Sequence, residues 1–266
     1  MMVLPIVLVA QRKPKIKGSR IVSQVNEELP AFNAIQLVDK LDIVLKKSYG
    51  PGYEVIADDN LIDILKFKVE DSTLIISSYY DVTAKKQFDI TVNYTYLKAI
   101  TLKEGSILTK DAIEGDELFV DGFADTKLDI KASASVMDIN LEDSSQGDFN
   151  VDVDSLNITL NNRSQAYVYA VNEVSLMDLE GNASLTLEGT SERIEATVSG
   201  DAKYKGEKME AAMVRANVQH EANVRLNVLS ELELSAKGNS RTYLYGNPKI
   251  TILEFMDTSQ LIKKVE

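Results

Sequence analysis

Residues 181–202 read GNASLTLEGTSERIEATVSGDA, and this stretch decides the fold. It opens on the turn Gly181-Asn182-Ala183 and closes on a similar turn, Gly200-Asp201-Ala202, 19 residues later. A third turn follows at Gly238-Asn239-Ser240, and a degenerate one stands at His220-Glu221-Ala222. Between the turns apolar residues alternate with polar ones, which is typical of β-strands. A repeat this short, made of strands, predicts that each unit is one coil of a β-solenoid.

Two series of residues carry this period through the second half of the chain. One consists of small residues just after a turn: Ser106, Ala124, Ser145, Ala166, Ala183, Ala202, Ala222 and Ser240. The other consists of the apolar residues that open a strand: Leu118, Met137, Leu156, Val174, Ile194, Val214 and Leu232. The two series stay in phase along the chain. They predict stacked coils whose inward residues form continuous apolar columns.

The predicted architecture is all-β: a right-handed parallel β-helix with coils of about 19 residues, preceded by a less regular all-β part. The handedness follows from the right-handed crossover rule. Helical repeats are disfavoured because strict alternation leaves no amphipathic helical stripe, and a two-sheet sandwich is the alternative. We expect five segments, which are a signal peptide (1–10), an N-terminal extension (11–30), the irregular all-β part (31–102), the repetitive β-helix (103–249) and a C-terminal cap or tail (250–266).

The composition excludes several classes of function. The 266 residues carry 41 acidic and 29 basic side chains, a net charge of −12, and no long basic block, which argues against nucleic acid or an anionic membrane surface as the main partner. There is no cysteine, so disulfides, thiolate nucleophiles and cysteine-ligated metals are ruled out. There is also no tryptophan, which weakens the case for a carbohydrate-active enzyme.

The first ten residues, MMVLPIVLVA, resemble the apolar region of a secretory signal, with a small residue at Ala10 for the cut. A basic stretch follows, and ten residues are too few to span a bilayer. We therefore expect an exported protein that is periplasmic, displayed on the cell surface or secreted. No cysteine follows the leader, so a lipid anchor is not expected, and no later stretch is apolar enough to be transmembrane.

Two polar features are candidates for metal chemistry. Asp148, Asn150, Asp152 and Asp154 alternate with apolar residues, so one strand would range four oxygen-bearing side chains along an outer face. Calcium accepts such ligands, although an ordinary solvated face explains the same pattern. His220, the only histidine, stands where neighbouring coils have glycine, which indicates an exposed turn residue. We expect no cofactor other than this weak calcium candidate.

Tyrosine pairs mark a possible binding surface at Tyr167, Tyr169, Tyr243 and Tyr245. They could pack between strands, or they could form an adhesive face that offers contact area and a hydrogen-bonding hydroxyl together. No motif singles out a catalytic pair among the many carboxylates, so no catalytic residue is predicted. The arginines show no shared spacing that would predict an anion-binding cluster: Arg163, Arg193, Arg215, Arg225 and Arg241.

Several short elements, in this order, resemble the putative autotransporter adhesin, head GIN domain family, which is common in Bacteroidetes. Besides the repeated glycine-polar-small turns, they are Ile16 to Ser19, Phe32 to Ile35, Leu41 to Val44, Leu74 to Ile76, Leu97 to Gly105 and Tyr243 to Pro248. The resemblance implies a β-helical envelope or surface protein without an established enzymatic activity. Here residues such as Ser164 and His220 stand at corners where the family usually has glycine.

Together these features predict a non-enzymatic, exported envelope protein. As an adhesin-like binding module it would present a polar, acidic flank of the β-helix to a glycan or an envelope protein. The alternatives are a β-helical enzyme acting on polysaccharide, and a periplasmic scaffold or sensor. The ends of a solenoid need capping, so copies of the chain could also associate through them.

Overall fold

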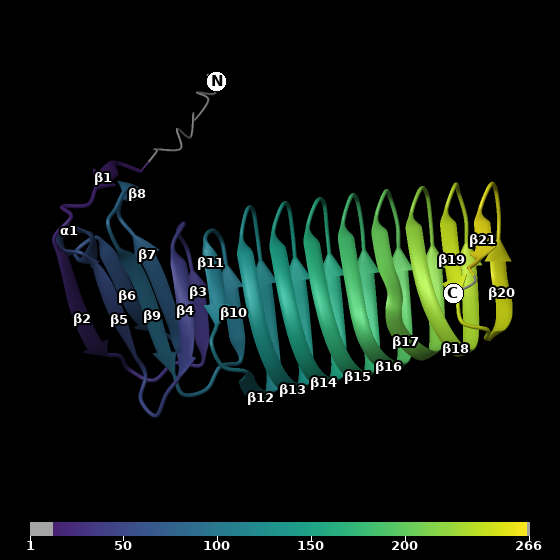
Figure 1. The fold of residues 1–266 in the computed structure, drawn as a ribbon, viewed down its shortest axis with the longest axis horizontal. Coiled ribbons are helices and arrows are strands. Elements are labelled where there is room, and N and C mark those ends of the chain that lie inside the picture. The colour runs from purple at the N-terminus through teal and green to yellow at the C-terminus, as the bar shows by residue number, and fades with distance from the viewer. Residues whose placement is uncertain (1–12, 265–266) are drawn as a thin grey trace, which may run out of the picture.

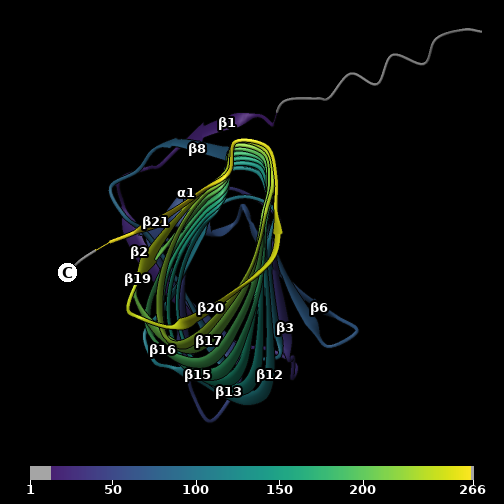
Figure 2. The same ribbon diagram turned by 90° about the vertical axis from the view of Figure 1, so that its right-hand side faces the viewer.

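The computed structural model describes residues 13–264, and they form one long β-solenoid (Figure 1). The predicted signal peptide, residues 1–10 with Ala10, lies outside the described residues. About nine turns follow one another at intervals of about 19 residues, so the fold predicted from the repeat is confirmed. In Figure 2 the chain rises on the right, crosses the top and descends on the left while it advances toward the viewer, which is a right-handed coil.

The first part of the chain forms short strands and one helical turn. They are β1 (Lys15–Lys17), β2 (Val22–Glu28), β3 (Ala34–Leu37), β4 (Asp42–Lys47), β5 (Gly52–Asp58), α1 (Asp59–Ile62), β6 (Leu65–Glu70), β7 (Thr73–Ser78), β8 (Asp81–Ala84), β9 (Phe88–Tyr94), β10 (Ala99–Leu102) and β11 (Ser106–Thr109). The only helix among residues 13–264 is therefore far too short to cross a membrane.

The second part consists mostly of long strands, each of which makes up most of one coil. They are β12 (Ile113–Gly122), β13 (Lys127–Leu141), β14 (Gln146–Leu160), β15 (Gln165–Leu179), β16 (Ser184–Val198), β17 (Lys203–Val218), β18 (Asn223–Ala236), β19 (Arg241–Tyr245), β20 (Lys249–Phe255) and β21 (Gln260–Lys263).

Each strand from β13 to β18 bends once, so it contributes to two facing walls of the solenoid (Figure 2). We call the part before the bend the first arm and the part after it the second arm; in β14 they are residues 146–153 and 155–160. The first arms pair in parallel with one another, then with β19 and β21. The second arms pair in the same way and end at β20. We call the two walls the first-arm sheet and the second-arm sheet.

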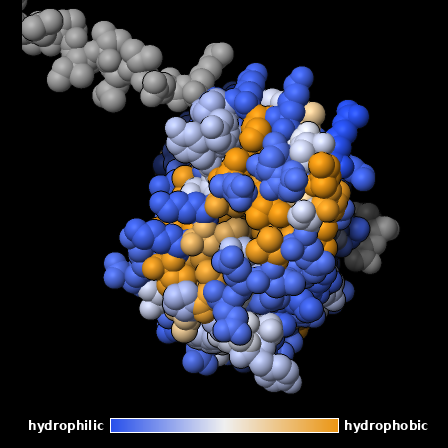
Figure 3. All heavy atoms as spheres, turned by 90° about the vertical axis from the view of Figure 1, so that its left-hand side faces the viewer, coloured by the Kyte–Doolittle hydropathy of each residue, from blue (hydrophilic) through white to orange (hydrophobic). Residues whose placement is uncertain are grey.

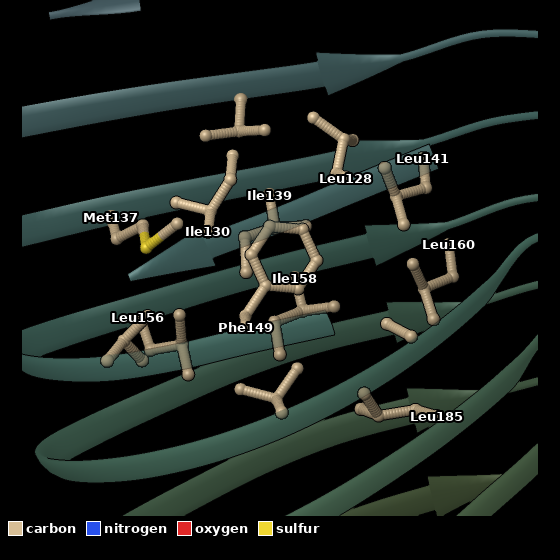
Figure 4. Close-up of a cluster of buried hydrophobic side chains, with 14 of the residues drawn as sticks. Leu128, Ile130, Met137, Ile139, Leu141, Phe149, Leu156, Ile158, Leu160 and Leu185 are labelled. Carbon is tan, nitrogen blue, oxygen red and sulfur yellow. The ribbon is translucent and has the colours of Figure 1, made fainter. Parts of the chain in front are cut away.

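The core lies between the two sheets and is built from inward residues stacked coil over coil (Figure 4). Phe149 on β14, for example, pairs with Ile130 on one side and Val168 on the other, and all three side chains are fully buried. The Phe149 ring also covers Gly147, where a Cβ atom would come within 2.2 Å of it. Gly147 is therefore required by the size of the neighbouring phenylalanine, because interiors are close-packed.

At the tight corners, one residue per coil adopts a positive φ, and a small buried residue follows two positions later. The positive-φ residues are Ala124, Asp143, Asn162, Gly181, Gly200, His220, Gly238 and Asp257. The small buried residues are Thr126, Ser145, Ser164, Ala183, Ala202, Ala222 and Ser240. Left-handed backbone suits glycine best and asparagine or aspartate next, which explains most of the first series.

This arrangement corrects some positions predicted from the repeat. Ala124 is the positive-φ residue itself, and Ala166 lies inside a strand two residues after the corner residue Ser164. In the apolar series, the residue of this coil that fills the buried column is Ser175, which pairs with Leu156. The predicted residue, Val174, lies one position before it. The errors arise because serine or threonine can fill a narrow column as well as alanine.

The N-terminal end of the solenoid is closed by chain reversal. The first-arm sheet continues through β11, β4 and β9 and is then capped by antiparallel β5 and β2. The second-arm sheet continues through β10, β3 and β7 and is capped by antiparallel β6. Figure 3 looks onto this end, where extensive apolar areas lie among polar side chains.

Candidate binding face

Two candidate clusters predicted separately form one surface on the outer side of the first-arm sheet. Tyr167 and Tyr169 on β15 lie directly beside Asp148 and Asn150 on β14, because the strands pair in that register. Tyr167 is 41% exposed and Tyr169 is 45% exposed, so neither is a core residue. The strand alternation that buries Val168 points both hydroxyl-bearing rings outward.

The second tyrosine pair stands in the same two rows of this sheet, further along the axis. Parallel pairing links Tyr167 to Thr186, Thr186 to Lys205, Lys205 to Arg225 and Arg225 to Tyr243. Four strand spacings of about 4.8 Å place Tyr167 and Tyr243 roughly 19 Å apart. Tyr245 follows Tyr243 as Tyr169 follows Tyr167. We call the outer side of the first-arm sheet from β14 to β21 the tyrosine face.

An irregularity in β17 lies midway between the two tyrosine pairs. The pairing of β16 with β17 shifts between Thr186 and Glu188, and the pairing of β17 with β18 shifts between Gly206 and Glu210. Such a β-bulge puts extra residues of one strand opposite fewer residues of its partner and re-aims their side chains. Here the additional residues include Glu207 and Lys208.

Cross-strand ion pairs occupy the centre of the tyrosine face. Lys208 Nζ lies 3.0 Å from Glu188 Oε1, and Arg225 Nη1 lies 2.8 Å from Glu207 Oε1. The other carboxylate oxygen of Glu207, Oε2, is buried and has no hydrogen-bond partner within residues 13–264. A buried acceptor without a donor is unusual in folded proteins.

These contacts also shift the proton affinities of the groups involved. The hydrogen bond from Lys208 holds the pKa of Glu188 below its ordinary value and raises the pKa of Lys208. The same Glu188 carboxylate also raises the pKa of the neighbouring Tyr167 hydroxyl. The hydrogen bond with Glu207 raises the pKa of Arg225. Tyr167, Glu188, Lys208 and Arg225 are thus held in their usual charge states near neutral pH.

A hollow of about 380 Å³ opens beside Tyr167, near the corner end of the first arms. Its polar lining comes from five neighbouring strands and includes Gln146, Asp148, Gln165, Tyr167, Thr186 and Lys205. Amide, hydroxyl, carboxylate and ammonium groups beside an aromatic ring match the hydroxyl groups and apolar ring faces of a sugar.

The predicted calcium candidates lie at one edge of the tyrosine face. Asp148, Asn150 and Asp152 point outward at alternate positions of β14, and Asp154 is exposed at the bend. Alternate residues are about 6.6 Å apart, so a shared ion would require the side chains to lean together. Burial and the nearby Asp129 raise the pKa of Asp148. Within residues 13–264 no three acidic or histidine side chains group closely enough to hold a metal. Calcium binding stays a prediction, which melting temperatures with and without calcium test.

His220 lies in an exposed corner, as the repeat predicts. Its φ of 61° places it in the positive-φ series between Gly200 and Gly238. Its Nδ1 atom accepts a long hydrogen bond, 3.4 Å, from the Gly200 amide of the preceding coil. Asp257 does the same for the Gly238 amide at 2.9 Å. A side chain at this corner can therefore accept a hydrogen bond from the backbone of the preceding coil, and His220 has this structural role.

The basic residues of the tyrosine face are what the sequence reasoning missed. Arg225 and Arg241 lie in the first-arm sheet, whereas Arg193 and Arg215 lie in the second-arm sheet. Only the register reveals that Lys205 and Arg225 are neighbours in one row. Their separation of 20 residues, about one coil, was the available signal.

A second, larger hollow lies on the outer side of the second-arm sheet. Its volume is about 670 Å³, and its lining includes Thr159, Leu176, Asp178, Thr197, Arg215 and Asn217. A row of short polar residues runs through it: Asp121, Asn140, Thr159, Asp178, Thr197, Asn217 and Ser235. It has no aromatic pairs, so its chemistry differs from that of the tyrosine face.

Solved structures with this fold include proteins from two Parabacteroides species. A putative lipid binding protein from Parabacteroides distasonis superposes with a TM-score of 0.65 at 16% identity, over 94% of this chain and 100% of the other. A putative adhesin from the same species gives a TM-score of 0.64 at 17% identity, over 94% and 100%. A putative adhesin from Parabacteroides merdae gives 0.60 at 16% identity, over 95% and 100%. At these identities the likeness shows the fold alone.

No curated protein matches the chain. The family described as putative auto-transporter adhesin, head GIN domain, matches residues 31–248, which include the whole tyrosine face apart from β21. Neither this description nor the names of the structural neighbours refers to an enzyme. Because the match spans most of the chain, the protein belongs to the family of putative auto-transporter adhesins with a head GIN domain.

Proposed function

We propose that this protein is an adhesin-like binding module of the cell envelope and that it binds a glycan on the tyrosine face. One observation carries the proposal: an exposed tyrosine pair on β15 and a half-buried one on β19 stand in the same rows of a sheet, about 19 Å apart along the axis, with polar side chains between them. Such a surface can follow an extended chain of sugars, since each coil advances by a similar short step.

The chemistry of the face supports a glycan ligand. Tyrosine presents a flat apolar ring and a hydroxyl at low entropic cost, and binding hot spots are enriched in it. The hollow beside Tyr167 adds hydrogen-bonding groups of several kinds. The family description and the apolar segment at residues 1–10 support export to the envelope, where glycans are exposed.

A glycan array with matched variants tests the proposal. We expect the unmodified protein to be retained by at least one glycan, and the variant Tyr167→Ala with Tyr243→Ala to bind it roughly tenfold more weakly or worse. Phe119→Ala is the control, because Phe119 is also 41% exposed but lies on the second-arm sheet. Retention by no glycan, or equal binding by the tyrosine variant and the control, would contradict the proposal.

N-terminal sequencing of the protein recovered from cells tests the export component separately. A mature chain that starts at Gln11 supports a cleaved leader, whereas a retained Met1 argues against it.

A further inference from the structure

We infer that the ligand of the tyrosine face is an anionic glycan, whose carboxylate or sulfate groups are held by Lys205, Lys208 and Arg225 between the two tyrosine pairs. This inference rests on the proposed function and adds the charge class of the ligand.

The distribution of charge is the first observation. The protein carries a net charge of −12, yet the tyrosine face is rich in basic side chains from β17 onward. These residues are exposed or half-buried: Lys203, Lys205, Lys208, Arg225, Arg241 and Lys264. On the same strands the acidic side chains of this face are Glu207 and Glu210. A basic area on an acidic protein attracts anions while the remaining surface repels them.

The geometry of the cations is the second observation. Lys205 and Arg225 are directly paired across β17 and β18, in the row that contains Tyr167 on one side and Tyr243 on the other. The bulge places Lys208 in the neighbouring row, opposite Glu188. An anionic group of the ligand would therefore meet two or three cations midway between the aromatic rings, where flanking contacts exclude water and strengthen the attraction.

The cations retain capacity for a ligand. Lys205 makes no ion pair within residues 13–264 and lines the hollow beside Tyr167. Arg225 makes its ion pair with Glu207 through Nη1, and a guanidinium has five N–H donors in all. Donors that are not used within the protein fit a ligand that carries anionic groups.

The second-arm sheet has no equivalent of this arrangement. Its outward row at the same level contains Leu176, Glu195, Arg215 and Glu233, and Arg215 is paired with Glu233 at 3.0 Å. Acidic side chains alternate there with the cation, and no tyrosine flanks them. An anionic chain is therefore directed to the tyrosine face.

Polygalacturonate, a linear polymer of uronic acids, and neutral dextran are suitable probes for the full-length protein. We expect polygalacturonate to bind and dextran to bind at least tenfold more weakly, because the charge-assisted contacts would be missing. Raising the salt concentration should weaken the binding of polygalacturonate, since screening acts on exposed charges. A sulfated dextran of the same length distinguishes a requirement for carboxylate from a requirement for any anion.

The decisive variant is Lys205→Gln with Arg225→Gln. We expect it to bind polygalacturonate roughly tenfold more weakly or worse. The matched control, Arg215→Gln with Lys249→Gln, changes the charge equally on the second-arm sheet, and we expect it to bind as the unmodified protein does. Arg225→Lys, which retains the charge, should recover part of the affinity, and circular dichroism checks that each variant is folded.

The outcomes separate the two proposals. Equal binding of polygalacturonate and dextran, or equal binding by the two charge variants, would overturn the anionic ligand. If the tyrosine variant still weakens binding in that case, the glycan-binding face itself stands. If a single-stranded DNA oligonucleotide binds as tightly as polygalacturonate, the face recognises polyanions in general, and the assignment of a glycan is wrong.

Discussion

The two ends of the solenoid solve the same problem differently. Each apolar column of the core must stop somewhere, and its last residue would be left in water. At the N-terminal end one such column passes through the fully buried Leu74 and stops at its antiparallel partner Val69, which is half-buried; at the C-terminal end the same column stops at Ile252, which is 46% exposed. Within residues 13–264 no further coil covers Ile252 (Figure 1).

The difference shows that each coil of the repeat can pair with a further coil and that the repeat itself does not end the stack. Parallel pairing of one coil onto the next always presents a fresh edge and a fresh set of inward side chains. Only chain reversal ends this series, as in antiparallel β5, β2 and β6. The open end consequently exposes a group of large apolar side chains: Ile250, Ile252, Leu253, Phe255 and Met256.

The largest predicted effect compares Leu74, which lies beneath the N-terminal end of that column, with Ile252 at its C-terminal end. Leu74→Ala should lower the free energy of unfolding by about 2–5 kcal/mol, because it opens a cavity in a packed interior. Ile252→Ala should cost less than about 1 kcal/mol, because much of the side chain is already in water. Urea denaturation followed by circular dichroism measures both. Similar losses in the two variants would show that the C-terminal end is covered in solution.

Corner glycines near each end should give the next largest effects. Gly105 has a φ of +87°, and a Cβ atom there would lie 2.3 Å from the Leu41 carbonyl oxygen. Gly238 has a φ of +81°, and its Cβ would lie 2.8 Å from the His220 carbonyl oxygen. We expect either glycine-to-alanine change to cost about 1–3 kcal/mol, with the greater loss at Gly105. Thermal denaturation of the two variants measures both losses of stability. A greater loss for Gly238→Ala than for Gly105→Ala would contradict this prediction.

A more local effect concerns the paired strands β1 and β8 near the N-terminal end, which we call the strap. Strands β1 and β8 pair there, and the fully buried Asp58 side chain accepts hydrogen bonds from the amides of Arg20, Lys86 and Gln87 at 3.1, 3.1 and 3.2 Å. Burial alone would raise the pKa of Asp58, but these backbone hydrogen bonds outweigh it and hold the pKa below the ordinary value of 3.8.

The sign of the resulting pH dependence follows from that direction. A lowered pKa means that Asp58 stabilises the folded strap fully above the unfolded value of 3.8, and that this contribution is lost as the pH falls through the folded value. Hydrogen exchange should therefore show that residues near β1 and β8 lose protection in acid before the C-terminal coils do. Asp58→Asn should lower protection of the strap already at neutral pH and remove this difference. An unchanged pH profile in the variant would mean that another carboxyl group controls the strap.

The smallest predicted effect is a gain of stability at one corner. His220 is the one histidine in a series where glycine has the lowest backbone cost, so His220→Gly should stabilise the protein by up to about 1 kcal/mol. Loss of the long hydrogen bond to the Gly200 amide should offset part of this gain. Ala124→Gly is the control. Ala124 belongs to the same positive-φ series nearer the capped end, and an alanine side chain makes no such hydrogen bond. A lower melting temperature for His220→Gly would show that the histidine contact outweighs the backbone cost.

Much of the fold could be predicted from local pattern because a solenoid repeats local structure. Alternation identified the inward residues, such as Leu185 and Leu187, and the turn motif located most corners. The exact corner position was missed where serine replaced alanine, as at Ser164. The candidate binding face was predicted only in pieces, since its tyrosines belong to two strands that lie about four coils apart in sequence.

The sequence by itself determined the coil: its length, its inward and outward faces, and the residues that can turn its corners, because each depends on side chains only a few positions apart. The tertiary structure alone decided how coils align. The regular register of β17 on β18 places Lys205 beside Arg225, a bulge in β17 sets Lys208 opposite Glu188, and within residues 13–264 chain reversal closes one end of the rod but not the other. All three depend on hydrogen-bond register between distant strands, which no local pattern encodes.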